Sequence, residues 1–300
     1  MKNYEAKGYI NGIAGAISYG MNPLFALPMY SHGYGVNSVL FYRYLFAVVI
    51  YGCLLKFFKK TDFRINIKEL GLLFVFGIIF SLSSIFLFLA FKYIDSGIAC
   101  TILFGYPIMV AFISRVFYKE RLPKIILAVL CMVVLGIYML YGGKPQGNLN
   151  ICGVIYVLLS ALSYAIYLVG VKHVNTIKHI KPDKLTFYVM LFGLSVYIWN
   201  LRFCTQLQML DGWFVTGCAV MLAIFPTIIS LETVTYSVKF IGATKTAILG
   251  ALEPLTALFF GVLLFGETLS VRIVAGIVMI LAGVLVMIMY NNVHKTLTNR

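Results

Sequence analysis

A glutamate followed by a proline interrupts an apolar stretch near the C-terminal end of the chain, at Glu253 and Pro254. A charged side chain placed in lipid costs about 2.5–3.5 kcal/mol or more. Glu253 should therefore face the protein interior or carry a proton. Three roles fit such a group: it can bind a substrate amine, carry a coupling proton, or form a hydrogen bond with the broken helix. The sequence leaves all three roles open.

The proline has a counterpart in the first half of the chain. Proline has no N–H group, so Pro254 deprives the carbonyl of Gly250 of its helical partner, and Pro107 does the same to Leu103. Such breaks are tolerated in membranes where polar side chains or cavity water take over the freed groups. We predict that the two prolines form a pair of gating bends at mid-depth. A static kink that only shapes the packing is the alternative.

Most of the chain is too apolar for a soluble protein. Of its 300 residues, 61% are hydrophobic and 11% are charged, whereas about a quarter of the residues in soluble domains are charged. A helix needs about 20 apolar residues to cross the hydrocarbon core. We therefore expect an all-α integral membrane protein with ten transmembrane helices. The apolar blocks lie at about 8–29, 36–57, 69–91, 96–118, 124–141, 152–171, 185–204, 213–236, 242–265 and 271–290.

The positive charges are distributed unevenly among the loops. The formal net charge is +14. If ten helices begin in the cytoplasm, eighteen Lys and Arg residues fall on the cytoplasmic side and four on the other. Membrane proteins concentrate such residues on the cytoplasmic side, so we expect both termini there and the protein in the cytoplasmic (inner) membrane. The basic residues then contact anionic lipid head groups, and nucleic acid is not an expected partner.

The two halves of the sequence resemble each other. Residues 91–140 align without a gap with residues 238–287, at a constant offset of 147. Coincidences between apolar residues are common in such a sequence, whereas those between charged residues, prolines or glycines are not. The informative coincidences are Lys92 with Lys239, Pro107 with Pro254, Glu120 with Glu267, and Gly136 with Gly283.

This repeat predicts the organisation of the chain. Residues 1–141 form the first five-helix repeat, residues 142–150 a linker, and residues 151–300 the second five-helix repeat. A second copy that starts after five crossings enters the membrane from the opposite side, so the two repeats should be inverted. Inverted repeats are typical of secondary transporters, whose substrate sites lie near the middle of the membrane.

Several polar side chains reach that level. At 1.5 Å per residue, Glu253 lies about 16 Å from the inner boundary of the hydrocarbon core. By the same measure Tyr19, Tyr106 and Tyr164 lie roughly 15–18 Å from the faces where their helices start. We expect a central substrate-binding pocket with tyrosine walls and Glu253 as its acidic group. Alternatively, the tyrosines are packing residues whose hydroxyl groups bond neighbouring carbonyls.

Two further polar residues lie closer to the outer face. Arg43 and Asn22 are about 9 Å below it, and both are candidates for binding substrate. Arg43 could hold a substrate carboxylate or a counter-ion such as Glu253, or it could extend outward to the membrane surface.

Other acidic residues have peripheral positions. Glu232 falls near the inner face, close to Lys239 and Lys245, and is expected to form a peripheral ion pair. Glu120 and Glu267 end their helices just outside the core and are expected to fix the following turns.

Several motifs in the sequence resemble those of a known family. The runs that end in Glu120 and Glu267, with Leu122 and Leu269 following, are similar to a pattern of the ten-helix EamA-type permeases in the drug/metabolite transporter superfamily. The arginine in Phe41-Tyr42-Arg43-Tyr44-Leu45 also resembles that family, as do Ser18-Tyr19-Gly20 and Ser163-Tyr164-Ala165, where the family commonly has Trp-Gly and Trp-Ala. The resemblance implies a ten-helix inner-membrane transporter with a central cavity. Members move amino acids, other metabolites, drugs or nucleotide sugars.

The expected function is export of a small organic solute, such as an amino acid or related metabolite, by alternating access. Protons are a candidate coupling ion, membrane lipids are the surroundings, and the protein would be a monomer or homodimer. No cofactor or metal is expected, because the six cysteines include no CxxC pair. A lipid flippase and a nucleotide-sugar antiporter remain alternatives. The protein is not expected to be an enzyme; a membrane enzyme acting on lipids would have only His173 and His179 as candidate residues.

Overall fold

The computed structural model describes residues 2–90, 93–94, 99, 102–120, 123–141, 150–265 and 270–298. In this part of the chain all regular secondary structure is helical. Most of the expected linker and Glu267 lie outside the described residues.

The first half consists of long helices with one early break. The helices are α1 (Lys2–Gly20), α2 (Asn22–Ser31), α3 (Val36–Cys53), the π-helical turn η1 (Leu54–Phe58), α4 (Ile67–Ala90), α6 (Tyr106–Tyr118) and α7 (Lys124–Tyr141). The first apolar block is thus divided into α1 and α2 at Met21, where a proline occupies the first turn of α2. Proline is tolerated there because the N–H groups of a first turn have no helical partner.

The second half contains more interruptions. Its helices are α8 (Ile151–His173), α9 (Asn175–His179), α10 (Pro182–Asn200), α11 (Trp213–Ala223), the π-helical turn η2 (Ile224–Ile229), α12 (Ser230–Ile241), α13 (Ala243–Leu249), α14 (Leu252–Phe265) and α15 (Val271–Thr298). The side chain of Asn150 accepts a hydrogen bond from the N–H of Cys152 and so caps α8.

Within the described residues, five helical stretches are long and apolar enough to cross a membrane individually. They are Val36–Phe58, Ile67–Ala90, Ile151–His173, Trp213–Ile241 and Val271–Tyr290. The pairs α1–α2 and α13–α14 are each broken, and α6 is shorter. The protein is therefore an integral membrane protein, while the count of ten crossings stays a prediction.

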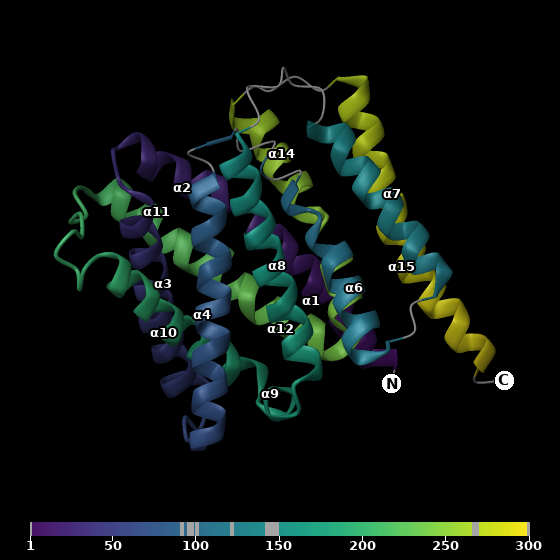
Figure 1. Ribbon diagram of the computed structural model, residues 1–300, viewed down its shortest axis with the longest axis horizontal. Helices are drawn as coiled ribbons and strands as arrows, with labels where there is room; N and C mark the ends of the chain where they lie inside the picture. The colour runs from purple at the N-terminus through teal and green to yellow at the C-terminus, as the bar shows by residue number, and fades with distance from the viewer. Residues whose placement is uncertain are drawn as a thin grey trace.

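Helices of one half pack mainly against helices of the other half (Figure 1). In the order of the two repeats, α1 corresponds to α8, and α4 corresponds to α11 and α12. Helix α1 packs against α12, and in the same way α8 packs against α4. The same exchange relates the pair α3–α11 to α10–α4, and the pair α1–α14 to α8–α6. The pairs α3–α10 and α7–α15 each join corresponding helices, and α7–α15 forms one edge of the bundle (Figure 1). The main contacts between the two halves are thus preserved when the halves are interchanged.

Small residues allow this close packing, as is common between membrane helices. Ser83 of α4 and Ser160 of α8 each donate a hydrogen bond to the other's carbonyl, with O···O distances of 3.0 and 2.7 Å. At the α7–α15 contact, a Cβ atom on Gly136 would lie 2.8 Å from Ile280 and 2.9 Å from the carbonyl oxygen of Gly276. Glycine at position 136 therefore sets the distance between α7 and α15.

This contact generates a stability prediction. Gly136→Leu should force α7 and α15 apart and destabilise the protein by about 1–3 kcal/mol, because overpacking displaces a backbone that cannot move aside. Thermal unfolding of the purified protein in detergent measures the effect as a lower Tm. Gly217→Leu is the matched control, since no atom lies within 4 Å of a Cβ at that position. Equal melting temperatures for the two variants would contradict the prediction.

Candidate functional site

Glu253 lies in the first turn of α14, directly after a break in the chain's path. Helix α13 ends at Leu249, and α14 starts at Leu252. The carbonyl of Gly250, which Pro254 was predicted to leave without a partner, accepts a hydrogen bond from the N–H of Glu253 at 2.9 Å. The helix therefore ends and restarts here, and no single continuous helix bends.

Pro107 lies in an equivalent setting. Helix α6 starts at Tyr106, so Pro107 also occupies a first turn, where its missing N–H leaves no helical bond unmade. The preceding turn is closed by a hydrogen bond from the N–H of Gly105 to the carbonyl of Ile102, at 2.9 Å. Both prolines thus mark restarts of helices at corresponding places in the two halves. Their role as gating bends remains a prediction.

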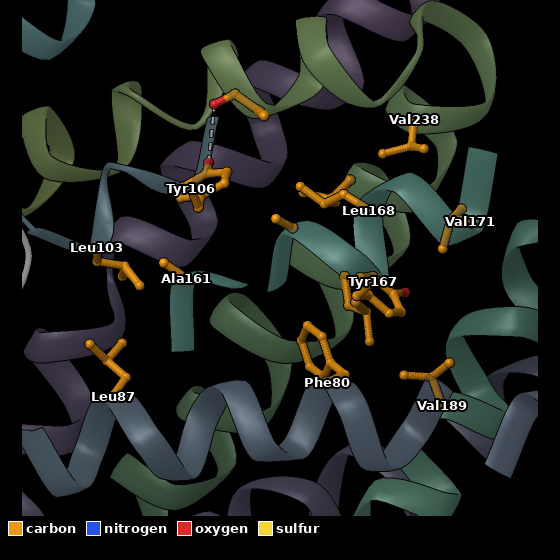
Figure 2. Packing of buried hydrophobic residues seen from close by; sticks show 14 of the residues in the cluster. Phe80, Leu87, Leu103, Tyr106, Ala161, Tyr167, Leu168, Val171, Val189 and Val238 are labelled. Carbon is orange, nitrogen blue, oxygen red and sulfur yellow. Dashed lines mark hydrogen bonds between the residues drawn. The ribbon is translucent and has the colours of Figure 1, made fainter. Parts of the chain in front are cut away.

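The side chain of Tyr106 connects the two breaks. Its hydroxyl donates to the carbonyl of Ala247 in α13 at 3.1 Å, the dashed line in Figure 2. A Cβ atom on Gly250 would lie 1.7 Å from this hydroxyl oxygen, so only glycine fits at position 250. The ring of Tyr106 also meets that of Tyr164 edge to face, with centroids 5.0 Å apart. This hydrogen bond is of the kind proposed in the packing alternative, although Tyr106 also lies beside Glu253.

Glu253 is buried and has tyrosines for neighbours. Its side chain is 8% exposed, and its carboxyl group lies within electrostatic range of the hydroxyl groups of Tyr19, Tyr106 and Tyr164. Helix α1 comes very close here, since a Cβ on Gly20 would lie 2.4 Å from the carbonyl oxygen of Glu253. The structure thus brings together the four side chains that were placed at one depth. Among the described residues, the Glu253 carboxyl group has no ion-pair partner.

Arg43 is completely buried and does not extend to the membrane surface. Its Nε donates to the hydroxyl of Thr227 at 2.6 Å, and its Nη2 donates to the carbonyl of Pro226 at 2.9 Å. Its Nη1 is buried without a hydrogen-bond partner among the described residues. The guanidinium carbon lies 5.8 Å from the centre of the Tyr19 ring. Tyr19 therefore lies next to both Arg43 and Glu253, and these two form no ion pair with each other.

The partners of Arg43 belong to the π-helical turn η2. Pro226 cannot donate to the carbonyl of Leu222, four residues earlier. The hydroxyl of Thr227 supplies the missing donor at 2.9 Å and in turn accepts the hydrogen bond from Arg43. This role of Thr227 was missed in the sequence analysis. The feature that could have indicated it is a hydroxyl residue directly after a proline in an apolar stretch.

Asn22 is buried at the start of α2, immediately after the break at Met21. Its side-chain oxygen has no hydrogen-bond partner in the described part of the chain. Among the described residues, no hydrogen bond or ion pair joins it to the other five candidate residues, although α2 packs against α14 and α11.

An aromatic cluster that sequence reasoning missed continues from Tyr164 toward α4 and α10. Phe80 lies beside Tyr167, with centroids 5.1 Å apart (Figure 2), and 6.3 Å from Tyr164. Tyr44 extends the cluster to Tyr197, at 4.7 Å. With 20 tyrosines in the chain, residue type alone gave no means of selecting these.

Glu232 has a different partner from the one expected. Its carboxylate lies 2.6 Å from the ammonium group of Lys59, which also lies 3.3 Å from Asp183. The side chain of Lys239 instead donates to carbonyl groups, among them that of Ile180. Burial alone would lower the pKa of Lys59, but the hydrogen bond and charge of Glu232 and the charge of Asp183 outweigh it and raise that pKa. The hydroxyl of Tyr236 completes the group by donating to Asp183 at 2.6 Å.

Glu120 and His173 have a structural explanation. The two side chains lie 3.7 Å apart and join the end of α6 to the end of α8. The imidazole ring of His173 also stacks on Tyr118, with centroids 4.1 Å apart. In the described residues, no group of three or more His, Cys, Asp or Glu side chains could hold a metal ion.

The sequence matches the model of the EamA-like transporter family twice, over residues 6–142 and 151–289. The chain belongs to this family. An uncharacterized transporter from Archaeoglobus fulgidus is 31% identical over 192 residues, which cover 64% of this chain and 67% of the relative. The uncharacterized transporter YdfC from Bacillus subtilis is 25% identical over 262 residues, covering 84% and 81%.

A crystal structure of another protein has the same fold. It aligns with a TM-score of 0.78 over 95% of this chain and 98% of the other, at 16% identity. Membership of the EamA-like transporter family and the apolar helices together establish a membrane transporter built from two family repeats.

The two hydrogen bonds of the Thr227 hydroxyl group, to Leu222 and from Arg43, generate a second prediction. Thr227→Val should destabilise this EamA-like transporter by about 1–3 kcal/mol, because it leaves the carbonyl of Leu222 and the Nε of Arg43 buried without partners. Thr227→Ser retains the hydroxyl group and should stay within about 1 kcal/mol of the wild type. Thermal unfolding in detergent compares the three proteins. A valine variant as stable as the serine variant would contradict this account of η2.

Proposed function

We propose that this EamA-like transporter exports an amino acid or related metabolite across the cytoplasmic membrane by alternating access. Two inverted five-helix repeats would exchange conformations around a substrate site near the middle of the membrane. Support comes from the helix contacts, which are preserved when the two halves are interchanged, and from the paired helix restarts at Pro107 and Pro254.

The observation that carries the substrate proposal is a pair of buried ionisable groups, one basic and one acidic. Arg43 and Glu253 are 0% and 8% exposed, and neither has an ion-pair partner among the described residues. A buried charge without a counter-charge costs several kcal/mol. A zwitterionic solute would supply both counter-charges, with its carboxylate at the free Nη1 of Arg43 and its ammonium group at Glu253.

The tyrosines suit such a solute. Tyr19, which lies next to both charged groups, would contact the atoms between the carboxylate and the ammonium group. Tyr106 and Tyr164 would pack against an apolar side chain. Asn22 has a free buried acceptor and would take a further N–H group. In the absence of solute, a proton on Glu253 would remove its charge, which links the same residue to proton coupling.

The solute can be identified by its effect on stability. Ligands that bind only the folded state raise its melting temperature. A ligand concentration of 100 times Kd adds about 2.7 kcal/mol to the free energy of unfolding. Screening amino acids and related metabolites against the purified protein should give an increase for zwitterions. Arg43→Lys is expected to abolish it, because lysine cannot reproduce the fork of the guanidinium group.

Glu253→Gln tests the acidic group. In proteoliposomes, this variant should bind the solute identified by the screen about 10- to 100-fold more weakly, since it loses a charge-assisted interaction of about 1.5–3 kcal/mol. Its flux should also respond less to a pH gradient than that of the wild type. Glu69→Gln, at the start of α4, is the matched control. Unchanged flux and an unchanged response to the gradient would remove Glu253 from the mechanism.

The orientation can be tested independently. We expect both termini in the cytoplasm, because α1 begins and α15 ends at the same end of the bundle, where α9 with its basic residue Lys178 also lies (Figure 1). A fluorescent protein that folds only in the cytoplasm should be bright at either terminus, and alkaline phosphatase should be inactive there. The opposite pattern would reverse the proposed orientation.

A further inference from the structure

A second repeat in the sequence lies outside the aligned segment. Residues 41–46 read FYRYLF, and residues 187–192 read FYVMLF, 146 positions later. The shared letters place a phenylalanine, a tyrosine, a leucine and a phenylalanine at the same positions. Tyr42 lies six positions after Val36, the first residue of α3, and Tyr188 lies six positions after Pro182, the first residue of α10. The two tyrosines therefore occupy equivalent places in equivalent helices.

Their surroundings are alike in detail. Tyr42 meets Phe41 edge to face, with centroids 5.4 Å apart at 78°, and Tyr188 meets Phe187 at 5.3 Å and 78°. On its other side, each ring stacks on the phenylalanine four residues later, at 6.0 Å for Phe46 and 5.9 Å for Phe192. The tyrosines are 7% and 9% exposed. The two motifs thus hold their tyrosine rings in the same way.

The two hydroxyl groups make equivalent hydrogen bonds to the opposite half of the chain. Tyr42 donates to the carbonyl of Gln208 at 3.0 Å, and Tyr188 donates to the carbonyl of Phe63 at 2.6 Å. Gln208 lies in the loop after α10, residues 201–212, here named the outer loop. Phe63 lies in the loop after α3 and η1, residues 59–66, here named the inner loop. Tyr42 of α3 therefore holds the loop that follows α10, and Tyr188 of α10 holds the loop that follows α3 and η1.

These hydrogen bonds lie at opposite ends of the bundle. Tyr42 is in the second turn of α3, whereas the inner loop begins beyond η1, at the far end of the same helical stretch. Residues 36–58 span roughly 33 Å at 1.5 Å per residue, about the thickness of the hydrocarbon core. One of the two hydrogen bonds therefore lies near each end of the bundle.

We propose that Tyr42 and Tyr188 are a pair of latches that determine which side of the membrane the central site faces. The inference rests on the alternating access proposed above. With the Tyr42 bond broken, the outer loop separates from α3 and the outer end opens. With the Tyr188 bond broken, the inner loop separates from α10 and the inner end opens. Both bonds are made in this structure, as expected for a state closed at both ends.

The contacts that accompany the two latches differ in charge. At the inner loop, Lys59 pairs with Asp183 and Glu232, and the Lys184 ammonium group donates to the carbonyl of Arg64. The outer loop is held by neutral groups. Tyr34 donates to the carbonyl of Met209 at 2.9 Å, and the amide nitrogen of Gln208 donates to the carbonyl of Gly33 at 3.0 Å.

The backbone of the outer loop is strained, which favours its release. Arg202, Phe203 and Cys204 have φ angles of 48°, 55° and 66°, and three successive non-glycine residues rarely adopt this left-handed conformation. The hydrogen bonds of Gln208 to α3 and the preceding turn oppose that strain. Removing one of them should therefore be sufficient to shift the position of the loop.

Hydrogen–deuterium exchange of the purified full-length protein tests the proposal without any solute. Tyr42→Phe retains the ring and removes only the hydroxyl group. It should speed exchange in residues 201–212 by roughly two- to tenfold, the effect of losing one hydrogen bond, and slow exchange in residues 59–66. Tyr188→Phe should do the reverse. Tyr156→Phe is the control, because its ring lies in a similar aromatic contact with Phe86 and Tyr93, and it should change neither loop.

The reciprocal change distinguishes a latch from a local tether. Faster exchange at one loop with no slowing at the other would overturn the proposal, because the two ends would then open independently. No change at either loop would overturn it as well. Failure of the amino acid proposal would appear separately, as an absence of flux or of ligand stabilisation in a protein whose loops still respond reciprocally.

Discussion

Lipid offers no hydrogen-bonding groups, so every helix interrupted inside the bilayer must find new partners for its freed backbone groups within the protein. Three carbonyl groups at two interruptions of this chain, the α13–α14 break and η2, meet the requirement differently. The carbonyl of Gly250 takes the N–H of Glu253, and the carbonyl of Leu222 takes the hydroxyl of Thr227. The carbonyl of Pro226 takes the guanidinium group of Arg43. Polar groups therefore collect at the breaks, and the candidate site has formed beside them.

The same requirement ties the halves together. Arg43 belongs to the first repeat and repairs a break in the second, while Tyr106 reaches across to the carbonyl of Ala247. Ser83 and Ser160 exchange hydrogen bonds between α4 and α8. None of these links is an ion pair, and around them the helices of the two halves pack through buried apolar side chains. Such an interface has a limited number of well-packed arrangements, which is a prerequisite for switching between discrete states.

The sequence predicted the depth of a side chain in the membrane, but not the helix face from which that side chain projects. Counting residues along each helix placed Tyr19, Tyr106, Tyr164 and Glu253 at one level, and the structure brings them together. The count could not say which face of a helix a residue occupies, nor which helix it meets. Glu232 was therefore assigned to lysines nearby in sequence, whereas its partner, Lys59, comes from the other half. Thr227 was overlooked for the same reason, since its role depends on Arg43, 184 positions away.

The covalent joining of the two repeats has an evolutionary consequence. A dimer of two identical chains in opposite orientations would carry the same residues at both ends, and any substitution would alter both at once. In a duplicated and fused gene, each copy is free to change separately. Here one end carries Lys59, Asp183 and Lys184, while the other carries Gln208 and Tyr34. The fused chain can therefore make one end more sensitive to ionic strength than the other.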